Sequence, residues 1–280
     1  MKTIGFVDYY ISEWHANNYP AWIKQVCEEL HLSYEVKYAY AKVEPSIEDG
    51  KSTDEWCKAY NVTRCYSIKE LCEKSDYIFL LAPSNPEKHL EFAKELFPCA
   101  QNKRIYIDKT FAPNLKEAKE IYSLAEKYHI SFFSTSALRY SQEIKNINKA
   151  NKVEVFGGGR SFEEYIIHQA EMLIKMMGTN IASVQVSSID NVDKCEIKYT
   201  DNRIGYLSFS PHYDFAFKVD EQETIKIQSE FFVNLIRKII IFFETGEIDF
   251  AKDQTLAAMS LIESLIKSKE NNGMLVNING

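Results

Sequence analysis

The stretch that decides the fold covers residues 104–141, RIYIDKTFAPNLKEAKEIYSLAEKYHISFFSTSALRYS. A short apolar run at 105–107 stops at an Asp-Lys-Thr tripeptide, a helical pattern follows over 115–128, and a second apolar run covers 130–134. This order predicts two parallel strands joined by a right-handed crossover. Because open α/β sheets place their ligands at the carboxyl ends of strands, Lys109 of the tripeptide is the first candidate for chemistry.

Composition and charge narrow the class of protein. With 280 residues, 45% of them hydrophobic and 26% charged, the chain can bury a large core as one domain or two. A net charge of −7 without a lysine or arginine cluster predicts no nucleic-acid and no membrane partner. Six cysteines without a C-x-x-C pair, together with no signal peptide, predict reduced thiols and a cytoplasmic location.

The first half of the chain alternates apolar runs with helical patterns. Strand-like runs lie at 2–7, 34–40 and 76–82, and helical patterns lie at 53–60, 67–74 and 87–96. This alternation predicts a parallel sheet. The sequence allows two starts for the first helix. If Ser12 is the N-cap, Pro20 lies inside the helix as a kink; if Asn18 is the N-cap, Pro20 lies in the first turn.

The second half changes character after about residue 150. A helix at 162–177, ended by Gly178, precedes short strand-like runs at 183–188, 195–200, 205–210, 215–219 and 224–228, and helices at 230–244 and 252–269 close the chain. The fold class is therefore α/β, with a parallel sheet followed by an α+β domain built on an antiparallel sheet.

Several of these landmarks follow one another as in a known family. Residues 76–83 (DYIFLLAP), His89, Asp108-Lys109-Thr110 in place of Glu-Lys-Pro, and Arg139 resemble the Gfo/Idh/MocA oxidoreductases, the superfamily of glucose-fructose oxidoreductase and inositol dehydrogenase. The resemblance implies a Rossmann-like nucleotide-binding domain over 1–140 and a substrate and oligomerisation domain over 141–251. It also implies that the helix at about 252–270 packs back on the first domain.

The same resemblance implies the reaction and the partners. These are NAD or NADP as cofactor, a sugar, polyol or related hydroxy compound as small-molecule substrate, and a homodimer or homotetramer formed through the exposed face of the second sheet. Hydride transfer from an alcohol needs a base of near-neutral pKa and a cation beside the developing alkoxide. By resemblance, Lys109 polarises the substrate oxygen, His168 is the general acid/base, and Glu164, four residues earlier on the helix, tunes it.

Further candidates surround the substrate. Arg139, Glu171 and His15 are expected to bind it, although Arg139 would equally brace the junction between the domains. His168 and Glu171 have helical metal-ligand spacing, but no second such pair exists, so we expect no metal.

The cofactor loop departs from the family pattern. Gly-x-Gly-x-x-Gly should follow the first strand, but Asp8, Tyr10 and Glu13 stand at its three positions. The expected cofactor contacts are therefore Asp8, Tyr9, Tyr10, Lys42, Ala82, Pro83 and Asp108.

Three accounts of this loop stay open. It binds a dinucleotide unconventionally, with Lys42 facing a 2′-phosphate; or Tyr9, Tyr10, Trp14 and His15 shape a different pocket; or the site is vestigial. The predicted function is an NAD(P)-dependent oxidoreductase, and the alternative is a cofactor-free binding or regulatory protein that retains the fold.

Overall fold

The structure, a computed structural model, describes residues 1–148 and 150–278. The chain divides into two compact units. The first unit contains Met1–Ala112, Lys116–Ser134 and Phe232–Asp249, and the second contains Pro113–Leu115, Thr135–Phe231 and the chain from Phe250 on. The described residues contain no helix that is long and apolar enough to cross a membrane.

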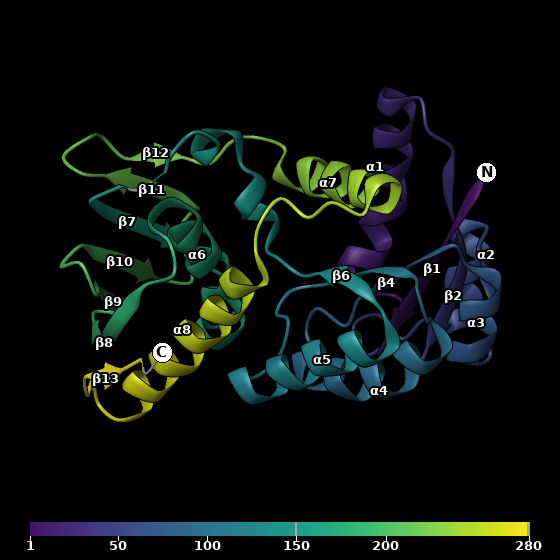
Figure 1. The fold of residues 1–280 in the computed structure, drawn as a ribbon, viewed down its shortest axis with the longest axis horizontal. Coiled ribbons are helices and arrows are strands. Elements are labelled where there is room, and N and C mark those ends of the chain that lie inside the picture. The colour runs from purple at the N-terminus through teal and green to yellow at the C-terminus, as the bar shows by residue number, and fades with distance from the viewer. Residues whose placement is uncertain (149, 279–280) are drawn as a thin grey trace. The chain divides into compact units, whose positions relative to one another are not determined.

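The first unit is built on a parallel sheet with strand order β3-β2-β1-β4-β5-β6. Figure 1 labels β1, β2, β4 and β6 of this sheet, with α4 and α5 alongside. Its strands are β1 (Lys2–Asp8), β2 (Tyr34–Ala41), β3 (Thr63–Arg64), β4 (Tyr77–Leu80), β5 (Arg104–Ile107) and β6 (Ser131–Phe133). The accompanying helices are α1 (Trp14–Leu30), α2 (Thr53–Tyr60), α3 (Ile68–Lys74), α4 (His89–Cys99), α5 (Leu115–Tyr128) and α7 (Phe231–Thr245). Each neighbouring strand pair is parallel, which confirms the α/β prediction.

Helices cover both faces of this sheet, which is why its central strands are apolar throughout. Phe79 of β4 packs against Tyr19 of α1 at 6.0 Å and against Phe243 of α7 at 5.5 Å between ring centroids. On the opposite face, Gly5 of β1 lies directly against Leu71 of α3.

The start of α1 differs from both alternatives of the sequence analysis. The helix begins at Trp14, its N-cap is Glu13, and Pro20 lies inside it. Neither Ser12 nor Asn18 is the cap. A glutamate seldom caps a helix, but here its carboxylate curls back to accept from the amides of His15 and Ala16.

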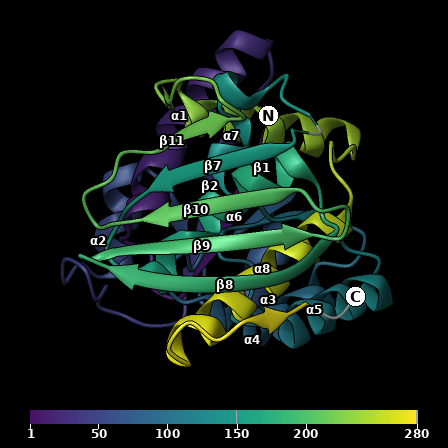
Figure 2. The same cartoon turned by 90° about the vertical axis from the view of Figure 1, so that its left-hand side faces the viewer.

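The second unit is built on a sheet of strand order β12-β11-β7-β10-β9-β8-β13 (Figure 2). Its strands are β7 (Lys152–Gly157), β8 (Ile181–Ile189), β9 (Val192–Tyr199), β10 (Ile204–Phe209), β11 (Ala216–Val219), β12 (Ile225–Lys226) and β13 (Val276–Asn277), with helices α6 (Phe162–Met177) and α8 (Lys252–Glu270). The sheet is antiparallel except for β7 and β10, which pair in parallel. Helix α6 and strands β8 and β9 lie between β7 and β10 in the sequence, which gives the long connection that parallel neighbours need.

Helix α8 differs from the expectation that it packs back on the first domain. It belongs to the second unit, where it packs on α6 and β8. The helix that joins the first unit from the C-terminal part of the chain is α7, with Arg104 donating to the carbonyl of Phe243 and Tyr34 to the carboxylate of Glu244.

The face of the second sheet turned away from α6 and α8 carries both charged and apolar side chains. Along β9, Lys194, Glu196 and Lys198 alternate with the buried Cys195 and Ile197. The neighbouring strands β7 and β10 place Phe156, Ile204 and Tyr206 on the same face. Self-association through this face stays a prediction.

Candidate functional site

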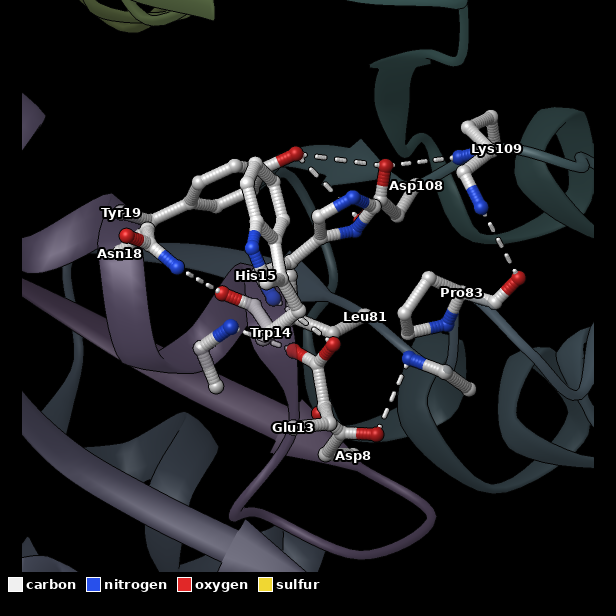
Figure 3. Close-up of polar contacts among 12 residues, drawn as sticks. Asp8, Glu13, Trp14, His15, Asn18, Tyr19, Leu81, Pro83, Asp108 and Lys109 are labelled. Carbon is white, nitrogen blue, oxygen red and sulfur yellow. Dashed lines mark hydrogen bonds and ion pairs between the residues drawn. The ribbon is translucent and has the colours of Figure 1, made fainter. Parts of the chain in front are cut away.

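The carboxyl ends of β1, β4 and β5 bring together two buried carboxylates and a lysine (Figure 3). These strands are adjacent and parallel in the sheet, so residues after each of them meet at one edge. Asp8 ends β1, Ala82 and Pro83 follow β4, and Asp108 and Lys109 follow β5. The backbone amide of Ala82 donates to Oδ1 of Asp8 at 3.0 Å, which joins the first two strand ends directly.

Asp108 is the most heavily bonded carboxylate of this edge. It accepts from the backbone amide of Lys109 at 2.8 Å, from the hydroxyl of Tyr106 at 3.2 Å, and from Nδ1 of His15. The Tyr19 hydroxyl lies 3.4 Å from both of its oxygens. Burial works to raise the pKa of Asp108, but the adjacent His15 outweighs it and holds this pKa below its usual value. Asp108 is therefore an anion at neutral pH.

His15 forms the partner of this anion. Because an ionised carboxylate only accepts, Nδ1 of His15 carries the proton and donates to Oδ2 of Asp108. The imidazole stacks on Tyr19 at 5.2 Å with 7° between the planes, and Trp14 lies 5.2 Å away on another side. Only 6% of His15 is exposed. His15 was expected to contact the substrate and Asp108 the cofactor, and the structure brings the two side chains into contact with each other.

Glu13 fills the place where an anion would bind at the N-terminus of α1. Its Oε2 accepts from the amide of His15 at 2.8 Å, and its Oε1 accepts from the amide of Ala16. These first-turn amides are the groups that hold the diphosphate in dinucleotide-binding folds. Burial raises the pKa of Glu13 to about 7.

Asp8 stands beside Glu13 and is equally buried. Burial, followed by the nearby Glu13, raises the pKa of Asp8 well above its usual value. Its Oδ2 has no hydrogen-bond partner within the described residues. A dinucleotide diphosphate does not fit this first turn, because the amides are already bonded and two acids lie next to them.

The loop between β1 and α1 is tied by hydrogen bonds to the segment at 46–49. Ser12 donates through its amide to Oγ of Ser46 at 2.9 Å and through its hydroxyl to Asp49 at 2.9 Å. Tyr10 is buried and donates to Glu48 at 3.3 Å. The phenol at the second glycine position is therefore buried and held by Glu48.

Lys42 lies just beyond the end of β2, where a 2′-phosphate would need a cation. Its Nζ is bonded to Glu91 and lies 2.8 Å from Glu95, both on α4. The positive charge of Lys42 is thus already paired with two carboxylates.

Lys109 and His89 tie the ends of β4 and β5 together. Nζ of Lys109 donates to the carbonyl of Pro83 at 3.3 Å, and the Lys109–Thr110 peptide is cis. The nitrogens of His89 face the carbonyls of Leu81 at 2.6 Å and Phe111 at 2.9 Å. Burial lowers the pKa of His89. The motif resemblance predicted no role for His89, whose two ring nitrogens here bridge the segments that follow β4 and β5.

The candidate residues of the second unit form separate pairs. Nδ1 of His168, on α6, is 2.7 Å from Oγ of Ser136. Glu164 forms an ion pair with Arg160 and not with His168. The expected effect of Glu164 on the His168 imidazole is therefore not supported by a direct contact. Within the described residues, no group of three or more His, Cys, Asp or Glu side chains is arranged to hold a metal ion.

Arg139 and Glu171 form a buried ion pair at 2.8 Å inside the second unit. Thr135 also donates to Glu171, at 3.1 Å, and the Arg139 guanidinium lies 4.2 Å from the ring centroid of Phe250. Burial raises the pKa of Glu171, although Arg139 opposes it. These contacts all lie within the second unit and favour a structural role of Arg139 there; binding of the substrate by Arg139 stays a prediction.

Comparison with known proteins gives a likeness of structure only. No family model matches the sequence, and no curated protein matches it. A putative myo-inositol dehydrogenase from Sinorhizobium meliloti 1021 superposes with a TM-score of 0.76 at 11% identity, covering 100% of both chains. Myo-inositol dehydrogenase from Lactobacillus casei, in complex with NAD(H) and myo-inositol, gives 0.78 at 12% identity, covering 100% of this chain and 97% of the other.

A third solved structure has a different printed activity. UDP-N-acetylglucosamine 3-dehydrogenase GnnA from Acidithiobacillus ferrooxidans gives a TM-score of 0.76 at 9% identity, covering 96% of this chain and 98% of that one. Identities this low show the fold alone. The resemblance stated from the motifs is thus confirmed for the fold: the chain has, over its whole length, the two-domain fold of these dehydrogenases.

Proposed function

We propose that this chain is an oxidoreductase that acts on a hydroxyl group of a sugar, polyol or related compound. The observation that carries the proposal is Lys109 beside the anionic Asp108 at the end of β5, in a chain whose full length has a dehydrogenase fold. Two of the similar structures are described as inositol dehydrogenases, and one of these holds myo-inositol. The proposed substrate class follows from these neighbours.

The proposed role of Lys109 is to stabilise negative charge on the substrate oxygen. An ammonium held near that oxygen favours the alkoxide as the hydroxyl loses its proton. His168 is the proposed acid/base of the second unit, and its contact with Ser136 fixes the orientation of its ring. Glu164 is left out of the mechanism, because its carboxylate is committed to Arg160.

NAD or NADP would supply the hydride acceptor for such a reaction. The first turn of α1 does not fit its diphosphate while Glu13 bonds the amides of His15 and Ala16. Lys42, balanced by Glu91 and Glu95, offers no spare charge to the 2′-phosphate of NADP. We therefore assign no step to the dinucleotide.

A second candidate function rests on the same contacts of Glu13. A small-molecule-binding or regulatory protein that keeps the fold without a dinucleotide needs no open anion site at α1. In such a protein Glu13 serves as a permanent cap of the helix.

Titration with NAD⁺, NADH, NADP⁺ and NADPH, followed by thermal shift and calorimetry, separates the two candidates. Binding of one of them together with turnover of myo-inositol or a related polyol supports the oxidoreductase. If none of the four dinucleotides binds at millimolar concentration, the oxidoreductase proposal is refuted and the binding-protein candidate is supported.

The variant Lys109→Ala tests the proposed lysine in any turnover assay. It should abolish turnover while it changes dinucleotide affinity by no more than a few fold. Lys119→Ala, an exposed lysine on α5, is the matched control and should keep full activity. A fully active Lys109→Ala protein would remove Lys109 from the mechanism.

A further inference from the structure

We propose that His15 is an additional general acid/base of this protein, oriented by Asp108 and presenting Nε2 to the substrate hydroxyl. The proposal rests on the proposed function for the class of substrate. The residue itself follows from contacts within the first unit, and the motif resemblance assigned it no proton-transfer role.

The first support is the orientation of the ring. A histidine acts as a base when one nitrogen donates to a fixed acceptor and the other keeps its lone pair. Asp108 is such an acceptor, because the amide of Lys109 and the hydroxyl of Tyr106 hold its Oδ1 while Nδ1 of His15 bonds its Oδ2. The proton of the neutral imidazole therefore resides on Nδ1.

The second support is that the ring cannot turn away from this acceptor. Tyr19 stacks on one face at 5.2 Å, Trp14 lies at 5.2 Å and Phe232 at 6.0 Å between ring centroids. A rotation of the imidazole would break the bond to Asp108 and the stack on Tyr19 together. Such a held ring is the preorganised arrangement that acid/base catalysis requires.

The third support is the state of Nε2. No described residue forms a hydrogen bond with Nε2. Nε2 is also not among the fully buried polar atoms without a partner, so part of its surface is exposed. The atom is therefore open on a side chain of which only 8% is exposed. Half-exposed Trp14 stands next to it, as an apolar surface on which the carbon face of a polyol can pack.

The proton transfer balances without any additional reactant. The substrate O–H bond breaks, its proton moves to Nε2, and the products are an alkoxide and an imidazolium. The anionic Asp108 stabilises that imidazolium, and the reverse step returns the proton to oxygen. The other charged or titratable groups around His15 are Glu13, Tyr19 and Lys109, with Asp8 beside Glu13.

The tautomer of His15 is the first test, and it requires no substrate. Nitrogen-15 NMR of the full chain should show neutral His15 protonated on Nδ1, with at least about a tenfold preference over Nε2. Asp108→Asn should reduce that preference, because an amide is both donor and acceptor. A wild-type proton on Nε2, or a preference that Asp108→Asn leaves unchanged, overturns the proposal.

Reactivity is the second test. An imidazole nitrogen with an open lone pair attacks diethyl pyrocarbonate and becomes carbethoxylated, and mass spectrometry identifies the modified histidine. His15 should be modified, whereas His89, fully buried with both nitrogens against carbonyls, serves as the internal control and should stay intact. Equal inertness of His15 and His89 overturns the proposal.

Turnover separates the failure of this proposal from failure of the proposed function. Where a polyol is turned over, His15→Gln should lower kcat by about 100-fold or more, with KM changed by only a few fold. His212→Gln, an exposed histidine, is the matched control. A fully active His15→Gln refutes the role of His15 alone. Absence of turnover in the wild-type protein refutes the proposed function, and the tautomer and reactivity tests still decide on His15.

Discussion

Replacing Glu13 by glutamine should make the protein more stable at mildly alkaline pH. Removing the carboxylate of an ordinary, exposed helix cap has the opposite effect there. Glu13 is buried, and burial raises its pKa from 4.5 to about 7. Because the folded-state pKa exceeds the unfolded one, the stabilising contribution of this group is fully present below pH 4.5. It is lost as the pH rises through about 7.

The magnitude follows from these two values. A rise in pKa from 4.5 to about 7 corresponds to about 3 kcal/mol of stability lost between acidic and mildly alkaline pH. Glutamine cannot ionise, so Glu13→Gln removes this loss. It also weakens the cap by about 1 kcal/mol, since its amide group accepts only one of the two bonds. Because about 1 kcal/mol of the Glu13 contribution is already lost at pH 5, the variant should be about as stable as the wild type at pH 5 and more stable by about 2 kcal/mol at pH 8.

Urea unfolding followed by tryptophan fluorescence measures this change. Trp14, Trp22 and Trp56 are the protein's three tryptophans, and all lie in the first unit with Glu13. Glu55→Gln is the matched control, since Glu55 also caps a helix start, but is exposed and has a pKa lowered by Ser52. A difference between variant and wild type that stays the same at pH 5 and pH 8 refutes the reasoning.

Other substitutions test the remaining contacts. Arg139→Met should destabilise the protein by about 3–5 kcal/mol in calorimetry, because it leaves Glu171 buried without a counter-ion; stability should return when Glu171→Leu is added. Gly5→Ala should cost about 1–3 kcal/mol by tryptophan fluorescence, since its Cβ would lie 2.7 Å from a methyl carbon of Leu71. Lys42→Ala should change stability by under about 1 kcal/mol, because its ion pairs are partly exposed.

The sequence predicted helices and strands well wherever a single hydrophobic periodicity dominated. The helices at 115–128 and 162–177 have the predicted bounds, because each has an apolar face with clear signals at its ends. The parallel sheet followed from apolar runs alternating with helices. Strands of two residues, such as β3, gave no periodicity to detect.

The pairings of the candidate site could not be predicted in the same way. His15 and Asp108 are 93 residues apart, and only the adjacency of β1 with β4 and of β4 with β5 brings them together. The cap by Glu13 was missed because its carboxylate curls back over its own helix, which is uncommon for glutamate. A glutamate just before an aromatic-rich helix start, with no Ser, Thr, Asp or Asn directly preceding the helix, was the available signal.

The contacts of the residues at the three glycine positions indicate a remodelled site and argue against a vestigial one. Asp8 binds the amide of Ala82, Tyr10 packs inward and reaches Glu48, and Glu13 bonds the first turn of α1. A site that had merely lost its ligand would leave those amides unpaired, whereas here each has a carboxylate partner. Yet keeping two acids buried with raised pKa values destabilises the fold at neutral pH, and stability alone gives no reason for it. Buried acids with raised pKa values are typical of functional sites, which is the reason to look for chemistry at this end of the sheet even without a dinucleotide.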